Sequence, residues 1–466
     1  MVEFVCISWW PAQKFPSYEW EIWIKQGLFE LNIPDQLIIG GMDIKLTPHH
    51  IRRKMMKMLS KIALTTTFMC LLVHTTYAAC GITSGSINIL ANDFPALRTY
   101  TDTARACAGS GADFKVNHTS EHNNLAMAAL SANPAEYSAR IGANSSVVPL
   151  MNEGLIRPMD DLVAKYGEGL QKSQLITING KVMAVAFMAN TQHLYYRKDI
   201  LNELGIAVPK TYEEVVAAAE KMRSSGKLLN PYAAAYKAGW NLAEEFVNMF
   251  LGHGGEFFKS GSAEPNINNP KGIATLKMLK TLAGYSNPDF LTHDSEAIKV
   301  EWESGKVGLM TLWASRSGTL LDDEGDPAIT AATKLGAPAT VGGGSIPAAT
   351  LWWDGFTLAT NRSDQDAEAS FQVLVHAATS KKMANDASDQ AVWLVDGFTP
   401  GPKSVGVLAA AKMGAKPYPM LAHMSLMHGA IGSEIVDFLQ GKETAQQALA
   451  DTEAAYRGKA REKGFL

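Results

Sequence analysis

Short apolar strand patterns alternate with helix-compatible runs from residue 86 onward, and this alternation constrains the fold more than any other feature. Ser86–Ala91 (SINILA) has a strand pattern, a loop follows it, and 96–106 is helix-compatible. A second helix pattern covers 123–132, and 136–141 is strand-like. Strands that alternate with helices form parallel sheets covered by helices, rather than a bundle or a sandwich. The sequence therefore predicts an α/β protein.

Composition and charge limit the number of domains and the kinds of partner. The chain has 466 residues, of which 47% are hydrophobic and 19% are charged, with a formal net charge of -4. A globular chain of this length is typical of two or three domains. Since the net charge is slightly negative and we find no long run of consecutive basic residues, the sequence gives no reason to expect nucleic acid or an anionic membrane as a partner.

An export signal lies inside the chain rather than at its start. Basic residues from Arg52 to Lys61 precede an apolar stretch over 62–73, and small residues around Ala78 follow. This order is typical of a secretory signal, and the apolar stretch is too short to span a bilayer. We expect residues 58–78 to be a signal peptide and the mature protein to be periplasmic. A buried helix of a globular domain is the alternative.

Residues 1–57 then precede the signal. The simplest interpretation is an N-terminal extension from a start codon assigned too far upstream, with Met58, Met56 or Met55 as the first residue. A cytoplasmic N-terminal domain is the alternative, and it would be marginally stable at this length.

The mature chain retains two cysteines, Cys80 and Cys107. A single pair in an oxidising compartment predicts a disulfide, and two buried thiols are the alternative. Because Cys80 follows small residues, a lipid anchor on Cys80 is a minority interpretation.

Several stretches resemble a known family. The most specific is NGKVMAVAFMANTQHLYYRKDILNELGIAVPKTYEEVVAAAEKM over 179–222, and further matches lie at 125–162, 254–258, 303–315 and 354–379. Together they resemble the extracellular solute-binding proteins of ABC importers, particularly the group that binds sugars. The resemblance covers nearly all of 86–466. The sequence departs from the family's pattern at two positions. Glu136 stands where the family usually has Asp, and Tyr212 stands where Trp is common.

The resemblance implies a two-lobed periplasmic-binding-protein fold, type II-like, with a hinge and a ligand cleft between the lobes. Residues 79–190 would form mainly the first lobe and 191–350 mainly the second, while 351–466 would supply crossing segments and C-terminal helices. It also implies a monomer that binds no cofactor or metal, captures a carbohydrate by hinge closure and delivers it to a membrane permease with ATPase subunits.

Aromatic side chains near strand ends are the first candidates for a sugar site, because sugar rings stack on flat aromatic faces. Trp240 precedes a helix pattern, and Trp313 ends an apolar strand pattern. Trp352 and Trp353 open a strand, so one of them should point to the opposite face. Packing in the core is the alternative for each tryptophan.

Polar side chains from the same positions complete the candidate site. Arg316 is expected to pair with Asp354 or to form a fork to ligand hydroxyls. A role on the exposed surface is the alternative for these residues. The other polar candidates are Asn92, Asp93, Asn144, Ser145 and Asn190.

Catalytic motifs are missing from the sequence. It contains no Gly-x-Ser-x-Gly, His-Glu-x-x-His, phosphate-binding Walker loop or Cys-x-x-Cys. His423 and His428 are five residues apart, whereas adjacent ligands on a helix face need three or four. We therefore expect a binding protein rather than an enzyme. The alternatives are an exported polysaccharide-active enzyme and a receptor for a non-sugar solute such as a polyamine or peptide.

Overall fold

The computed structural model describes residues 23–25, 28–30, 36–39, 42–45, 80–322 and 325–466. The chain divides into two compact units, Met1–Thr76 and Tyr77–Leu466. In the first unit, the described strands form two antiparallel pairs. These are β1 (Trp23–Lys25) with β2 (Leu28–Glu30), and β3 (Gln36–Ile39) with β4 (Met42–Lys45). The predicted signal peptide, 58–78, lies outside the described residues.

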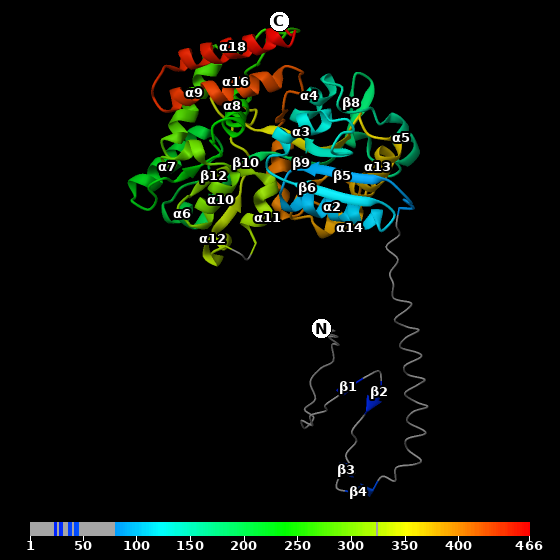
Figure 1. The fold of residues 1–466 in the computed structure, drawn as a ribbon. Coiled ribbons are helices and arrows are strands. Elements are labelled where there is room, and N and C mark those ends of the chain that lie inside the picture. The colour runs from blue at the N-terminus through cyan, green and yellow to red at the C-terminus, as the bar shows by residue number, and fades with distance from the viewer. Residues whose placement is uncertain (1–22, 26–27, 31–35, 40–41, 46–79, 323–324) are drawn as a thin grey trace. The chain divides into compact units, whose positions relative to one another are not determined.

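The second unit contains a larger sheet of eight strands (Figure 1). Its central order is β15-β9-β14-β7-β5-β6, with β16 beside β14 and β8 beside β9. The strands are β5 (Ser86–Ala91), β6 (Asp113–His118), β7 (Ala139–Ala143), β8 (Leu175–Ile178), β9 (Lys181–Asn190), β14 (Thr350–Leu358), β15 (Val392–Trp393) and β16 (Lys416–Pro417). The predicted α/β class is confirmed, but the sheet is mixed, because β14 runs antiparallel to both β7 and β9.

The strand predicted over 136–141 begins three residues later than expected. The backbone N–H of Ala135 donates to the Asn361 carbonyl at 2.8 Å, and that of Glu136 donates to the Ala129 carbonyl at 2.9 Å. These groups bond to loops and a helix, so regular pairing with neighbouring strands starts only at Ala139.

A smaller sheet has the order β11-β12-β10-β13. Its strands are β10 (Gln192–Arg197), β11 (Tyr232–Ala233), β12 (Leu309–Trp313) and β13 (Thr333–Leu335). Only Thr191 separates β9 of the larger sheet from β10 of the smaller one. The Thr191 hydroxyl donates to the Thr350 carbonyl at 2.8 Å, which ties this crossing to the start of β14, a second crossing point.

Helices cover both faces of the larger sheet. Ile87 and Ile89 of β5 belong to a core shared with α2 (Pro95–Ala108) and α13 (Asp364–Ala378). A separate core on the other face includes Leu90 of β5 together with residues of α3 (His122–Ser131) and α4 (Val147–Asn152). This arrangement follows from strand periodicity, since successive residues of a strand point to opposite faces.

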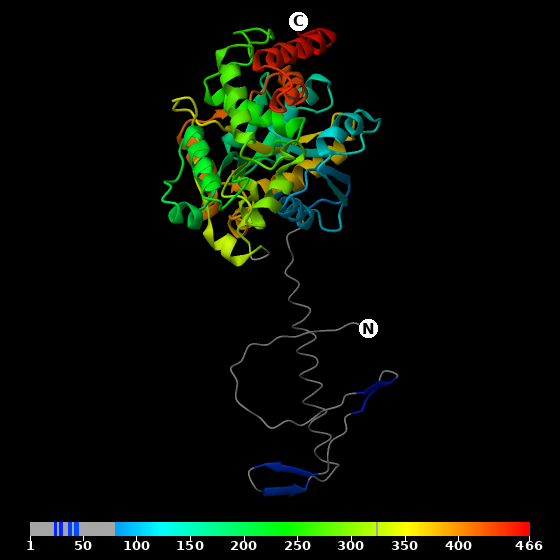
Figure 2. The same ribbon diagram turned by 90° about the vertical axis from the view of Figure 1, so that its left-hand side faces the viewer.

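A large core beside the smaller sheet is formed by α8 (Trp240–Gly252), α9 (Pro270–Ala283), α16 (Met424–Glu434) and α18 (Ala445–Glu462). Figures 1 and 2 show α16 and α18 stacked against α8 and α9. The remaining helices are α5 (Asp160–Tyr166), α6 (Lys198–Glu203), α7 (Tyr212–Ser224), α10 (Ser295–Glu303), α11 (Ser317–Leu320), α12 (Pro327–Ala332), α14 (Lys381–Asp386), α15 (Val405–Lys412) and α17 (Val436–Leu439). Within the described residues, each helix is too short or too polar to cross a bilayer.

A disulfide joins Cys80 to Cys107, near the end of α2, with the two Cα atoms 5.2 Å apart. This distance lies in the normal range for disulfides. The Cys80 N–H also donates to the Cys107 carbonyl at 3.0 Å. The start of the described part of the second unit is therefore fastened to the larger sheet's helical layer.

Candidate functional site

Five aromatic rings meet where the two sheets approach each other, and we call them the aromatic cluster. Trp240 begins α8, Trp313 ends β12, Trp352 lies in β14, Tyr418 follows β16, and His428 lies in α16. The Trp240 and Trp352 ring centroids are 5.6 Å apart, as are those of Trp313 and Trp352. Tyr418 packs on Trp352 at 4.4 Å, and His428 packs on Trp240 at 5.1 Å. Segments far apart in the sequence thus contribute to one group of packed aromatic rings.

The tryptophans differ in how much of each side chain is exposed to a ligand. Trp240 is 39% exposed and Trp313 is half-buried, whereas Trp352 is only 3% exposed. Trp353 packs against the core of α3 and α4, on the other face of the larger sheet. The strand alternation predicted for this pair is therefore observed. Trp240 and Trp313 can present a face to a ligand, and Trp352 supports them from beneath.

Buried polar groups support Trp352. Its indole N–H lies 3.0 Å from the Glu244 Oε1 and 2.6 Å from the Thr350 hydroxyl oxygen. Burial raises the pKa of Glu244 well above its usual value, and it raises the pKa of the adjacent Glu245 to about 8. Burial thus favours the uncharged form of both carboxyls, which lowers the cost of keeping two acidic residues in a core.

Three buried polar residues lie on β14 and on the neighbouring strand β7 or just after it, and we call Arg140, Asn144 and Asp354 the polar cluster. Arg140 is fully buried in β7 and donates to the Ser146 hydroxyl and to the Asn123 side-chain oxygen, both at 2.5 Å. Asn144 is 1% exposed, yet neither its amide oxygen nor its amide nitrogen has a hydrogen-bond partner among the described residues. A buried amide without hydrogen bonds is energetically unfavourable. Both the N–H donors and the oxygen acceptor of the Asn144 amide are unused.

Asp354 connects the polar cluster to the aromatic cluster. It is two residues after Trp352 in β14, so both side chains leave the strand on the same side. Asp354 lies opposite Ala143, which precedes Asn144 and packs against the core that contains Trp352. Burial raises the pKa of Asp354 to about 7, and the charge of Arg140 partly opposes this rise.

Some predicted site residues are occupied by contacts within the chain. Asp93 pairs with Arg98 at 2.7 Å, and the side-chain oxygen of Asn92 accepts the Asp93 N–H at 2.8 Å. The Asn190 amide bonds to Ser315 at 3.2 Å through both its nitrogen and its oxygen, so this residue joins the two sheets at the crossing. Ser145 is half-buried beside Asn144.

The expected pairing of Arg316 with Asp354 is wrong. Arg316 instead forms an ion pair with Glu296 of α10 at 2.8 Å. Its guanidinium carbon also lies 5.5 Å from the ring centroid of Phe94, the residue just before α2. Arg316 thus reaches from the smaller sheet to the larger sheet's helical layer, and an exposed glutamate on a neighbouring helix is nearer to it than the buried Asp354.

Sequence reasoning missed Glu244, Tyr418 and His428. The two histidines of the C-terminal region were considered only as metal ligands, and their spacing excluded that role. The aromatic role of His428 depends on contacts with residues 10 and 188 positions away. No local pattern carries such information.

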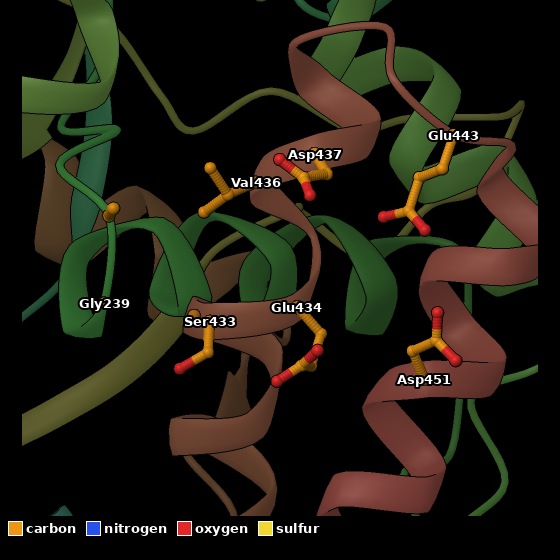
Figure 3. Close-up of a pocket in the computed structure, with 9 residues that line it drawn as sticks. Gly239, Ser433, Glu434, Val436, Asp437, Glu443 and Asp451 are labelled. Carbon is orange, nitrogen blue, oxygen red and sulfur yellow. The ribbon is translucent and has the colours of Figure 1, made fainter.

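A pocket of about 500 Å³ lies next to the start of α8, between α16, α17 and α18 (Figure 3). Four carboxylates line it, from Glu434, Asp437, Glu443 and Asp451. Burial and the neighbouring carboxylates raise the pKa of Glu443. Because no aromatic ring lines this pocket, a flat apolar ligand face has nothing to stack on there. The aromatic and polar clusters are the better candidate site.

The chain matches known proteins in sequence and in fold. Residues 121–385 match the sequence model of the bacterial extracellular solute-binding proteins. The chain is 28% identical over 280 residues to a probable ABC transporter-binding protein of Deinococcus radiodurans, covering 54% of this chain and 64% of that protein. It is 23% identical over 300 residues to a probable amino-acid ABC transporter periplasmic-binding protein of Sinorhizobium fredii, covering 62% and 66%. The matched region thus spans slightly less than two thirds of each curated relative.

The similarity to solved structures covers nearly the whole length of those structures. Maltose-bound MalE3 of T. maritima superposes with a TM-score of 0.71 at 17% identity, covering 80% of this chain and 99% of that one. An ABC transporter solute-binding protein of Agrobacterium radiobacter K84, in complex with ribitol, gives 0.72 at 18% identity, with 80% and 98% covered. These likenesses confirm the predicted two-lobed fold. On the match over 121–385, the chain belongs to the family of bacterial extracellular solute-binding proteins.

Proposed function

We propose that the protein is the exported receptor of an ABC importer and that it captures a neutral sugar or polyol between its two lobes. The observation that carries this proposal is the exposed ring of Trp240 in the aromatic cluster, next to a polar cluster in which the Asn144 amide is unused. Flat ring surface and unpaired hydrogen-bonding groups are the two features that a hydroxyl-rich ligand requires.

The chemistry of the two clusters matches the two kinds of surface on a sugar. The ring faces of a sugar carry C–H groups, which pack on indole rings. Its hydroxyls both donate and accept, and the amide of Asn144 can do the same. Burial raises the pKa of Glu244, which bonds to Trp352, and so favours its uncharged form over a carboxylate that would select a cationic solute.

Similar proteins support a polyhydroxylated ligand more than an ionic one. The solved structures include complexes with maltose, with ribitol and with D-mannitol. The curated relative from Sinorhizobium fredii is described as an amino-acid receptor, so an amino acid is the competing solute that an experiment has to exclude.

The crossing segments suggest how capture occurs. Thr191 and Thr350 lie at two adjacent passages of the chain between the sheets, and Asn190 and Ser315 are bonded at the same place. Rotation about these few residues would bring the lobes together around the solute. We assign residues 79–190 mainly to the first lobe, 191–350 mainly to the second and 351–466 to both. We also assign a monomeric, periplasmic form that passes its solute to a membrane permease and its ATPase subunits.

A thermal-shift screen tests the proposal. The purified protein is heated with neutral mono- and oligosaccharides, polyols, amino acids and polyamines. A ligand at 100 times its Kd adds about 2.7 kcal/mol to the free energy of unfolding, which is readily measured. We expect stabilisation by a sugar or polyol. Stabilisation only by amino acids or polyamines would contradict the proposal, and hydrolysis of an oligosaccharide would favour an enzyme.

A further inference from the structure

His428 is a buried histidine whose two ring nitrogens both contact other elements. It is 4% exposed in α16. Its Nδ1 lies 3.0 Å from the Tyr418 hydroxyl oxygen, and its Nε2 lies 3.0 Å from the backbone carbonyl oxygen of Trp240. The rings of His428 and Trp240 are 5.1 Å apart with an angle of 34° between their planes. The His428 side chain therefore contacts both the backbone carbonyl and the indole ring of Trp240.

These two contacts determine the tautomer of His428. A carbonyl oxygen can only accept, so Nε2 must carry the hydrogen that lies between it and Trp240. Burial lowers the pKa of His428 to about 4, so the ring is neutral near pH 7 and Nδ1 is bare. The Tyr418 hydroxyl can then donate to Nδ1. This is the one neutral arrangement in which both contacts are hydrogen bonds.

A second hydrogen bond links α16 to the start of α8. Gly432 follows His428 by four residues, so both lie on one face of the helix. The Gly432 carbonyl accepts the N–H of Gly239 at 3.0 Å, while His428 donates to the carbonyl of the next residue, Trp240. A Cβ at Gly432 would lie 2.2 Å from the Gly239 oxygen, so this close approach requires glycine. One face of α16 thus holds the start of α8 at two points.

We propose that His428 is a positioning residue: as the Nε2–H tautomer, which donates to the Trp240 carbonyl and accepts from Tyr418, it holds the backbone and ring of Trp240 in the orientation that a stacked solute requires. This inference rests on the proposed function. It adds that the binding surface of Trp240 is set by a histidine and a tyrosine that need not touch the solute.

Substitutions in the full chain test the role of His428. His428→Leu removes both hydrogen bonds, and we expect about tenfold weaker solute binding, since part of the stacking on Trp240 is lost. His428→Gln can donate to the Trp240 carbonyl and accept from Tyr418, so it should restore affinity to within about threefold of the parent chain. Tyr418→Phe should fall between the two. His423→Leu is the matched control, because His423 packs on Phe258 and not on Trp240.

A purely structural histidine would give a different result. In that case His428→Leu would lower the melting temperature but leave the Kd unchanged when measured well below that temperature, and glutamine would bring no recovery of affinity. Either outcome would overturn the inference.

The tautomer provides a test that does not need a solute. Nitrogen-15 spectra of the histidine-labelled full chain, with His428 assigned from the His428→Gln variant, should show a protonated Nε2 and a bare Nδ1 near pH 7. A protonated Nδ1 would contradict the inference. If no solute of any class binds, the proposed function fails while the spectra still decide the tautomer.

Discussion

The aromatic cluster and the polar cluster each include one residue of β14, Trp352 and Asp354, yet their hydrogen-bonding groups differ. In the aromatic cluster, the buried groups of Trp352, Tyr418 and His428 are hydrogen-bonded: the Trp352 N–H bonds to Glu244, and Tyr418 bonds to His428. In the polar cluster the Asn144 amide has no partner among the described residues. The rings of the aromatic cluster are thus held in place before a solute binds, whereas the polar cluster retains an amide without hydrogen bonds.

This difference indicates how the two regions divide the work of recognition. A preformed aromatic surface contributes affinity without reorganisation, because its rings are already held in place. Unpaired polar groups contribute specificity, because only a solute with matching hydroxyls satisfies them. We therefore expect substitutions to affect stability mainly in the buried layer of the aromatic cluster, and affinity mainly at the exposed Trp240 and at the unpaired Asn144 amide.

The largest expected effect is on stability, from Trp352→Ala. Trp352 is 3% exposed, and truncation of a buried tryptophan costs about 3–5 kcal/mol. It also leaves the Glu244 carboxyl without its indole donor. Urea unfolding measures the loss. Trp353→Ala is the matched control on the opposite face. Since Trp353 is only half-buried, it should cost less, and a larger loss there would reverse the assignment of the two faces.

The next effect concerns pH and the polar cluster. The pKa of Asp354 is raised from 3.8 to about 7 in the folded protein, so its contribution to stability is fully present below about pH 4 and is lost as the pH rises through 7. The loss is at most about 4 kcal/mol. Asp354→Asn removes this titration, so the free energy of unfolding of the variant should increase relative to the parent chain between pH 4 and pH 8.

The same substitution at an exposed aspartate, Asp102→Asn, is the matched control. Parallel stability curves for Asp354→Asn and the parent chain would show that Asp354 is charged when folded, and would contradict its burial in the polar cluster.

A smaller effect, on affinity, is expected for Trp240→Ala. Its ring is 39% exposed, so truncation should change the melting temperature little, while loss of stacking should weaken solute binding by about 30-fold, or roughly 2 kcal/mol. Titration calorimetry measures the change. In the same experiment Trp353→Ala should retain affinity, because Trp353 faces another core. Equal losses in both variants would remove the distinction between the two tryptophans.

The smallest effect is expected for Asn144→Ala. Because its amide makes no hydrogen bond within the described part of the chain, removal should leave stability unchanged or raise it by up to about 1 kcal/mol. Affinity should fall by about fivefold, the value of one modest hydrogen bond. The neighbouring Ser145→Ala serves as control. A clear loss of stability in Asn144→Ala would indicate that the amide has a structural role.

Local patterns predicted much of the fold. The strand over Ser86–Ala91 is found where the apolar pattern placed it. Helix α7 begins with a capping box formed by Thr211 and Glu214, which are three residues apart. Both depend on residues close together in the sequence. β7 begins later than predicted because the N–H groups of Ala135 and Glu136 bond to Asn361 and to Ala129 instead of to a neighbouring strand, and a pattern of apolar residues does not record that.

The site was less predictable for the same reason. Strand alternation was enough to separate Trp352 from Trp353. It could not show that Arg316 pairs with Glu296, or that His428 and Tyr418 join Trp240 and Trp352, because these contacts depend on how α8, α10, α16 and β14 pack. Long-range packing decides which polar groups remain free for a solute.

A crystal structure of the protein with the most stabilising solute from the thermal screen tests the central claim most directly. We expect a sugar or polyol packed on the exposed face of Trp240, with one of its hydroxyls hydrogen-bonded to the Asn144 amide. A solute bound away from both clusters, for instance in the carboxylate-lined pocket of Figure 3, would contradict the account.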